Sequence, residues 1–155
     1  DDKENRLRQR GELLRIRQYG DRCILTHKAP AETSASAAHK VRVETETEVE
    51  DGETLAAILE RLGYKPVFIY EKFRTEWADG EGHIVVDATP IGDFAELEGE
   101  PVWIDRMAAK LGIAPEKYLK ASYVQLFQDW KRATRHSAVH MTFAEIGILE
   151  TKPEP

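Results

Sequence analysis

The amino-acid sequence predicts an α+β protein made of antiparallel strands with flanking helices. Short runs that alternate apolar and charged residues fill most of the chain before Pro101. Turn residues such as Gly20-Asp21 and Asp79-Gly80 join neighbouring runs into hairpins. Apolar residues at helical spacing dominate only after Pro101. Because the strands follow one another directly, we expect antiparallel sheets and not parallel βαβ units.

The first predicted elements form a hairpin. The chain opens on a turn that leads into residues 12–19, where Leu14 and Ile16 alternate with Arg15 and Arg17. Residues 22–28, RCILTHK, form the expected return strand. The small polar residues 29–38 that follow predict a loop.

The stretch HKVRVETETEVED, residues 39–51, predicts a half-buried strand. The odd positions from Val41 to Val49 are all β-branched, and the positions between them are all charged. Asp51 then provides the N-cap of a predicted helix, which ends at Gly63. Further strands are expected at Lys65–Trp77, Gly82–Pro90 and Gly92–Glu100.

The last third of the chain predicts two helices. One spans residues 101–112 and ends at Gly112, and the other spans residues 115–135 with Pro115 near its start. We expect residues 1–150 to form a single domain and residues 151–155 to form a frayed tail.

Composition narrows the function classes. The formal net charge of −6 argues against general nucleic-acid binding. No apolar run reaches the roughly 18–20 residues needed to cross a bilayer, so we predict no membrane association. The only cysteine, Cys23, excludes an internal disulfide and is typical of a reducing compartment, which predicts a cytoplasmic protein.

Charges of one sign cluster on single strand faces. Arg-x-Arg, Glu-x-Glu and Lys-x-Arg pairs recur along the predicted strands. A face in contact with water explains one such strand, since antiparallel sheets are commonly solvated on one side. If the sheet closes into a barrel, however, a lining of acids and bases cannot form a dry core, because unpaired buried charge is too costly. A polyphosphate with a divalent cation would suit such a lining, with Arg42 facing phosphate and Glu44 and Glu46 facing metal.

Several motifs in order resemble the CYTH superfamily, also called triphosphate tunnel metalloenzymes. They are "LLRIR", "ILTHKAP", "VRVETETEV", "YEKFRTEW", "VVDATPIGDFAELEGE" and "IDRMAAKLGI…YLKASYVQLF". The resemblance covers most of the chain from Leu13 to Phe127 and implies an antiparallel β-barrel, the triphosphate tunnel. The family begins with a Glu-x-Glu-x-Lys strand, and this sequence starts after that point, so we expect the N-terminal strand to be absent from the fold.

The resemblance also implies the site residues. The family's basic, triphosphate-binding positions correspond to Arg15, Arg17, Lys28, Arg42, Lys72 and Arg74. Its acidic, metal-binding positions correspond to Glu44, Glu46, Asp87, Glu96 and Glu98. We expect magnesium or manganese as the cofactor.

The expected function is that of a metal-dependent enzyme like the class IV adenylate cyclases, which convert ATP to cyclic AMP and pyrophosphate. A triphosphatase that hydrolyses inorganic or thiamine triphosphate is one alternative, and a non-catalytic polyphosphate- or nucleotide-binding module is another. The tunnel charges suit all three, and the catalytic residues stay unknown. The expected partner is thus a small triphosphate molecule, and a homodimer remains possible.

Other residues have simpler interpretations. His136 and His140 are spaced as zinc ligands on a helix would be, but no third ligand is evident, so a surface or helix-end role is favoured. Cys23 is interpreted as an inert packed thiol. The stripe from Tyr123 to Trp130 predicts a core or an interface. Phe68 and Tyr70 are favoured as structural aromatics over contacts to a substrate ring.

Overall fold

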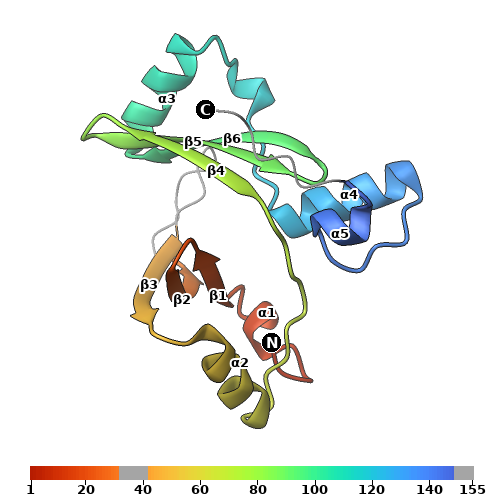
Figure 1. Cartoon of the computed structure of the whole chain (residues 1–155). Helices are drawn as coiled ribbons and strands as arrows, with labels where there is room; N and C mark the ends of the chain where they lie inside the picture. Colours follow the sequence, from red (N-terminus) through yellow and green to blue (C-terminus); the bar gives the residue numbers. More distant parts are fainter. Residues whose placement is uncertain (32–41, 149–155) are drawn as a thin grey trace. The chain divides into compact units, whose positions relative to one another are not determined.

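The computed structural model describes residues 1–31 and 42–148 (Figure 1). The chain divides into two compact units, residues 1–67 and residues 68–155. Each unit contains one three-stranded antiparallel sheet, and helices flank the strands in the sequence. The predicted α+β class with antiparallel sheets is therefore confirmed. The described strands pair as two separate sheets and not as one closed barrel. A single domain over residues 1–150 stays a prediction.

The first unit is built on the hairpin that the sequence predicts. Strand β1 (Leu13–Tyr19) pairs with β2 (Arg22–Pro30), and β2 pairs with β3 (Arg42–Val49). The opening turn is wrong in detail, because residues 6–9 form a single helical turn, α1 (Arg6–Gln9). Side-chain oxygens of Asp1 accept hydrogen bonds from the backbone N–H groups of Leu7 and Arg8, which explains why a helical turn forms here.

Helix α2 (Gly52–Arg61) follows β3 and confirms the predicted cap. The Asp51 side chain accepts a hydrogen bond from the Thr54 N–H at 2.9 Å. Gly63, just after the helix, has φ +92°, a left-handed conformation that glycine adopts without strain. At the other end, a Cβ atom on Gly52 would lie 2.5 Å from Cys23 Sγ, so glycine is needed where α2 starts against β2. Cys23 is buried there, as the packed-thiol interpretation expects.

The second unit contains β4 (Phe73–Ala78), β5 (Gly82–Thr89) and β6 (Gly92–Gly99), with β5 in the centre. Helix α3 (Pro101–Lys110) packs the buried Trp103 against Gly82 and Gly99, where any Cβ atom would crowd the indole ring. On β5, Gly82 lies on the opposite sheet face from the side chains of His83, Val85 and Asp87. Helix α3 therefore covers the face that does not carry these three side chains.

A short 3₁₀ turn, η1 (Pro115–Lys117), precedes helix α4 (Tyr123–Thr134), and one further turn, α5 (Phe143–Ile146), follows it. The predicted helix over residues 115–135 is therefore wrong in its first part. Ser122 explains the late start: its side chain and that of Gln125 bond each other's backbone N–H groups, which fixes the N-terminus of α4 at Tyr123. The core of this region contains Phe127, Ala138 and Met141.

Two strand predictions need correction. The long strand over Lys65–Trp77 is wrong, because only Phe73 onward joins the sheet. The preceding segment bonds elsewhere: the Met141 N–H donates to the Ile69 carbonyl and the Glu71 N–H donates to the Met141 carbonyl, both at 3.0 Å. The strand predicted over residues 39–51 is present as β3. Its described residues are mostly exposed on both faces, however, so the prediction of a half-buried strand is wrong. The predicted positions 39–41, most of the 29–38 loop and the 151–155 tail lie outside the described residues.

Candidate functional site

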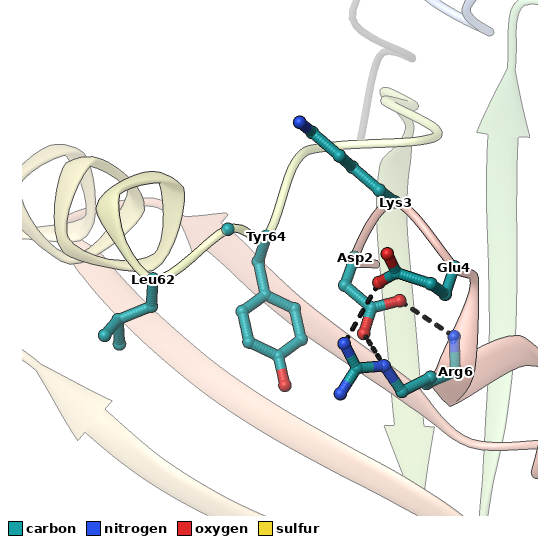
Figure 2. A pocket seen from close by; sticks show the side chains of 7 residues that line it. Asp2, Lys3, Glu4, Arg6, Leu62 and Tyr64 are labelled. Atoms are coloured by element: carbon teal, nitrogen blue, oxygen red, sulfur yellow. Dashed lines mark hydrogen bonds and ion pairs between the residues drawn. The ribbon is translucent and has the colours of Figure 1, made fainter.

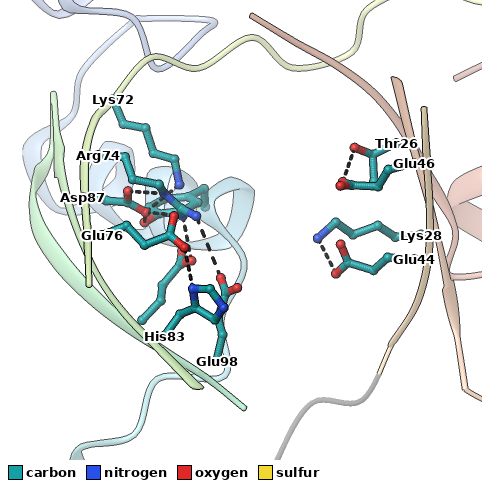
Figure 3. A network of polar contacts seen from close by, with 12 residues as sticks. Thr26, Lys28, Glu44, Glu46, Lys72, Arg74, Glu76, His83, Asp87 and Glu98 are labelled. Carbon is teal, nitrogen blue, oxygen red and sulfur yellow. Dashed lines mark hydrogen bonds and ion pairs between the residues drawn. The ribbon is translucent and has the colours of Figure 1, made fainter. Parts of the chain in front are cut away.

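Asp87 is the centre of a charged network in the second unit. Its carboxylate has no exposed surface and lies on the central strand β5. Arg74 Nε donates to Oδ1 and Arg74 Nη2 to Oδ2, both at 2.8 Å, while Lys72 Nζ donates to Oδ2 at 2.5 Å. The Tyr123 hydroxyl donates to Oδ2 at 2.6 Å. Figure 3 shows Lys72 and Arg74 pointing toward Asp87. One buried carboxylate therefore holds two cations in place.

The burial and pairing of these groups shift their pKa values. Burial raises the pKa of Asp87, but hydrogen bonds from Arg74, Lys72 and Tyr123 outweigh burial and lower its pKa to about 2. Burial lowers the pKa of Lys72, and the bond to Asp87 offsets this only in part. Burial and the bond to Asp87 both raise the pKa of Tyr123. At neutral pH Asp87 is thus an anion and Tyr123 is a neutral donor.

Glu96 and Glu98 extend the network along β6. The strand register pairs Val85 with Glu96 and His83 with Glu98, so both glutamates share the sheet face of Asp87. Arg74 Nη2 donates to Glu96 at 2.8 Å, and Arg74 Nη1 lies 3.9 Å from Glu98. The Glu98 side chain is 56% exposed and that of Glu96 is 33% exposed, so both carboxylates are open to an incoming ligand.

The first unit carries a second ladder of charges on one sheet face. Lys28 Nζ donates to Glu44 at 2.5 Å across β2 and β3. The buried Thr26 donates its hydroxyl hydrogen to Glu46 at 2.6 Å, and Arg15 Nη2 lies 3.7 Å from the same Glu46 oxygen. Figure 3 shows the Lys28–Glu44 and Thr26–Glu46 contacts side by side. The register places Arg17 on this face opposite Ile24 and Arg42 opposite Pro30.

Ten of the eleven predicted site residues therefore lie on a charged sheet face, and Lys72 reaches Asp87 from the segment just before β4, but the eleven residues fall into two sets. Arg42 is also used structurally, because its Nη1 donates to the Gly11 carbonyl at 2.5 Å. The first unit holds six of the residues: Arg15, Arg17, Lys28, Arg42, Glu44 and Glu46. The second unit holds the other five: Lys72, Arg74, Asp87, Glu96 and Glu98. Their roles in binding stay predictions.

The donor chemistry fits a hard divalent cation. Within residues 1–31 and 42–148, no group of three or more Asp, Glu, His or Cys side chains is arranged to hold a metal ion. Glu96 and Glu98, however, project from one strand face with accessible carboxylates. Mg²⁺ usually takes one or two protein carboxylates and completes its shell with substrate phosphates and water. Two accessible carboxylates beside the cations Lys72 and Arg74 therefore fit a hard divalent cation.

Sequence reasoning missed three participants. Tyr123 was assigned to a core or an interface, yet its hydroxyl bonds Asp87. A tyrosine in an otherwise apolar helix stripe is a usable signal, because a buried hydroxyl needs a partner. Thr26 bonds Glu46, and only the strand register identifies that contact. His83 Nδ1 lies 2.6 Å from Glu76 on the face of Asp87, a pair that no motif marks.

The remaining candidates have structural roles. His136 Nδ1 accepts a hydrogen bond from the Ala138 N–H and His140 Nδ1 accepts one from the Ile69 N–H, so the pair is tied to the backbone and not arranged around a zinc ion. Phe68 and Tyr70 pack against the core of the second unit, as expected of structural aromatics. Across the described residues, no helix has the length and apolar character of a membrane span.

A shallow pocket in the first unit is separate from the charged sheet face (Figure 2). Its lining includes Asp2, Lys3, Glu4, Arg6, Leu62 and Tyr64, and no predicted site residue. Arg6 forms ion pairs with Asp2 at 2.8 Å and with Glu4 at 3.0 Å. Because the lining charges neutralise each other, the pocket does not point to a charged ligand.

Similar solved structures agree with this architecture. A Pyrococcus furiosus conserved hypothetical protein is 27% identical, with a TM-score of 0.65 and 76% of each chain covered. A Pyrococcus horikoshii OT3 protein is 23% identical, with a TM-score of 0.65 and 74% of each chain covered. A Vibrio parahaemolyticus protein named "putative adenylate cyclase" is 20% identical, with a TM-score of 0.68, covering 83% of this chain and 76% of its own. At these identities the horikoshii and Vibrio proteins establish a shared fold.

The sequence comparison is more specific. No curated protein matches the chain. The sequence model of the CYTH domain matches residues 1–120, which include both charged sheet faces. The chain therefore belongs to the CYTH domain family.

Proposed function

We propose that this protein is a divalent-metal-dependent enzyme that acts on a triphosphate substrate, in the manner of class IV adenylate cyclases. Members of the CYTH family often act on triphosphates and are generally dependent on divalent metals, and the chain belongs to that family. The observation that carries the proposal is the Asp87 network, in which Lys72 and Arg74 lie beside Glu96 and Glu98 on one sheet face.

The charge balance of this face supports a requirement for metal. Among the predicted site residues at this face, two cations, Lys72 and Arg74, stand against three carboxylates, and Glu76 adds a fourth carboxylate on the same face. A triphosphate alone would add more negative charge. A divalent cation that occupies Glu96 and Glu98 would compensate, because it neutralises both the carboxylates and the phosphate oxygens. The existing ion pairs would then exchange partners: phosphate takes Arg74 and metal takes Glu96.

The other predicted residues have matching roles in the proposal. Arg15, Arg17, Lys28 and Arg42 hold phosphate oxygens, as cations on the first charged face, and Glu44 and Glu46 add carboxylate ligands. Asp87 keeps Lys72 and Arg74 oriented and serves as a further acidic group of the site.

The proposed reaction is nucleotidyl transfer within ATP. The ribose 3′-hydroxyl oxygen forms a bond to the α-phosphorus and gives its proton to water, the bond from that phosphorus to the bridging oxygen breaks, and pyrophosphate leaves with the electron pair of that bond. Bound magnesium or manganese would supply charge stabilisation at the phosphates. The chain's own cations bind the phosphate oxygens and align them, and they stabilise the charge that develops on the leaving pyrophosphate.

Product analysis tests this proposal. The protein is incubated with ATP, tripolyphosphate or thiamine triphosphate, each with magnesium or manganese. Cyclic AMP together with pyrophosphate is the expected result. Inorganic phosphate would replace the cyclase assignment by that of a triphosphatase. Binding of all three compounds without any product would contradict the enzyme and leave a non-catalytic binding module.

A further inference from the structure

Tyr123 contacts two members of the charged network at once. Its hydroxyl donates to Asp87 Oδ2 at 2.6 Å, and Lys72 Nζ lies 4.8 Å from the centre of its ring, within the range of a cation–π interaction. Tyr123 is the first residue of α4 and lies beyond residue 120, where the CYTH match ends. An element outside the matched region therefore contacts the candidate site.

The position of Tyr123 is well defined. The capping box of Ser122 and Gln125 fixes the start of the helix immediately before it. The Tyr123 ring stacks on Tyr70 with centroids 5.7 Å apart and meets the edge of Phe94, also at 5.7 Å. Phe94 is the β6 residue that the strand register pairs with Asp87. The ring is thus held between α4 and the sheet.

Lys72 depends on such a contact more than Arg74 does. Lys72 precedes β4 and has no strand partner, whereas Arg74 is paired with Asp87 in the strand register. A lysine side chain is a flexible four-carbon chain, and its ammonium group does not require one fixed bonding direction as the planar guanidinium of arginine does. The Lys72 ammonium group bonds Asp87 and lies over the Tyr123 ring, and the nearby charge of Glu96 also favours it.

We propose that Tyr123 is a positioning residue, which keeps Lys72 at the triphosphate site when a phosphate displaces it from Asp87. The inference rests on the proposed function, since it assigns Lys72 to the substrate. An anion competes with Asp87 for the ammonium group, but it does not compete with the face of an aromatic ring. The hydroxyl meanwhile keeps the Asp87 carboxylate directed toward Arg74.

A double-mutant cycle tests this role through tripolyphosphate binding, measured by calorimetry with magnesium on the whole chain. Tyr123→Leu removes both contacts and should weaken binding about tenfold or more, whereas Tyr123→Phe keeps the ring and should lose only about threefold. In a Lys72→Met background, Tyr123→Leu should change the affinity only about threefold, the part that comes from the hydroxyl bond to Asp87, because the ammonium group on which the ring acts is already gone.

Trp130→Leu is the matched control. Trp130 lies on the same helix and packs on Phe127 and His136, away from the network, so its loss should weaken binding less than about twofold. Thermal unfolding verifies that each variant is folded, and Tyr123→Phe provides the comparison if Tyr123→Leu does not fold.

Three outcomes would overturn the inference. Additive losses from Lys72→Met and Tyr123→Leu would contradict it alone, and so would wild-type affinity in Tyr123→Leu. A wild-type protein that binds no tripolyphosphate would contradict the proposed function, and the inference would fall with it.

Discussion

Arg74 and Asp87 face each other on neighbouring strands and form a bidentate ion pair. Their Cα atoms are register partners on β4 and β5, and both hydrogen bonds are 2.8 Å long. Such parallel N–H···O bonds fix the orientation of the guanidinium plane as well as its charge. Arg74 also reaches Glu96 on β6, so one arginine bonds both other strands of the second sheet.

Asp87→Asn is expected to destabilise the protein by about 3 kcal/mol, because it replaces the buried carboxylate that Lys72 and Arg74 share by a neutral amide, while the other carboxylates near Arg74, those of Glu96 and Glu98, are more exposed. Urea unfolding measures the change. Glu81→Gln is the control: Glu81 pairs with Arg106 in the same unit, but both side chains are about half exposed or more, and its loss should cost less than about 1 kcal/mol. Equal stabilities for the two variants would contradict the assigned role of Asp87.

The pKa of Asp87 predicts a loss of stability in acid. Its pKa in the folded protein, about 2, lies below the ordinary value of 3.8, so folding favours the carboxylate. This contribution of roughly 2 kcal/mol is complete above about pH 5 and is lost as the pH falls through about 4 to below 2. Unfolding free energies measured across this range should therefore fall less in Asp87→Asn than in the wild type. Parallel curves would show that Asp87 is not responsible.

Glu96→Gln with Glu98→Gln should weaken Mn²⁺ binding and metal-dependent turnover on the order of a hundredfold, because an amide oxygen carries no charge for a hard cation. Titration of Mn²⁺ followed by electron paramagnetic resonance measures binding directly. Glu81→Gln again serves as the control, since it removes an exposed carboxylate of the same unit. Full metal affinity in the double variant would refute the assignment of the pair.

Metal and triphosphate should bind cooperatively, because each ligand frees a group for the other. When the triphosphate takes Arg74, the Glu96 carboxylate becomes available to the metal, and when the metal takes Glu96, Arg74 becomes available to the triphosphate. Linkage requires the same factor in both directions. Calorimetry should give a tighter complex for magnesium tripolyphosphate than for free tripolyphosphate, and Glu96→Gln should reduce that ratio. If metal leaves the wild-type affinity unchanged, the exchange model is wrong.

The sequence predicted the strands that alternate strictly and the helix with an explicit cap. Asp51 and Gly63 identified α2. The turns at Gly20-Asp21 and Asp79-Gly80 identified the β1–β2 and β4–β5 hairpins. The sequence-based prediction failed where a hydrogen-bond partner far away in the sequence determines the local structure. Residues 69 and 71 bond Met141, which no local pattern reveals, so the predicted strand was too long. Pro115 predicted a helix start at that residue, whereas the capping box of Ser122 and Gln125 starts α4 eight residues later, at Tyr123.

The charged residues of the candidate site could be placed on strand faces by parity alone, since successive side chains alternate. Parity does not reveal which charges meet. That depends on the strand register, which pairs Arg74 with Asp87 and Lys28 with Glu44. The contribution of Tyr123 depends on how α4 packs against the sheet, and the spacing of apolar residues along one helix does not contain that information.

The central claim is that the charged sheet face around Asp87 binds a triphosphate. Calorimetric titration with magnesium tripolyphosphate tests this claim most directly. We predict saturable binding that Arg74→Gln abolishes and that Arg106→Gln, which breaks only the exposed pair with Glu81, leaves unchanged. Absence of binding by the wild type, or equal binding by the two variants, would contradict the account.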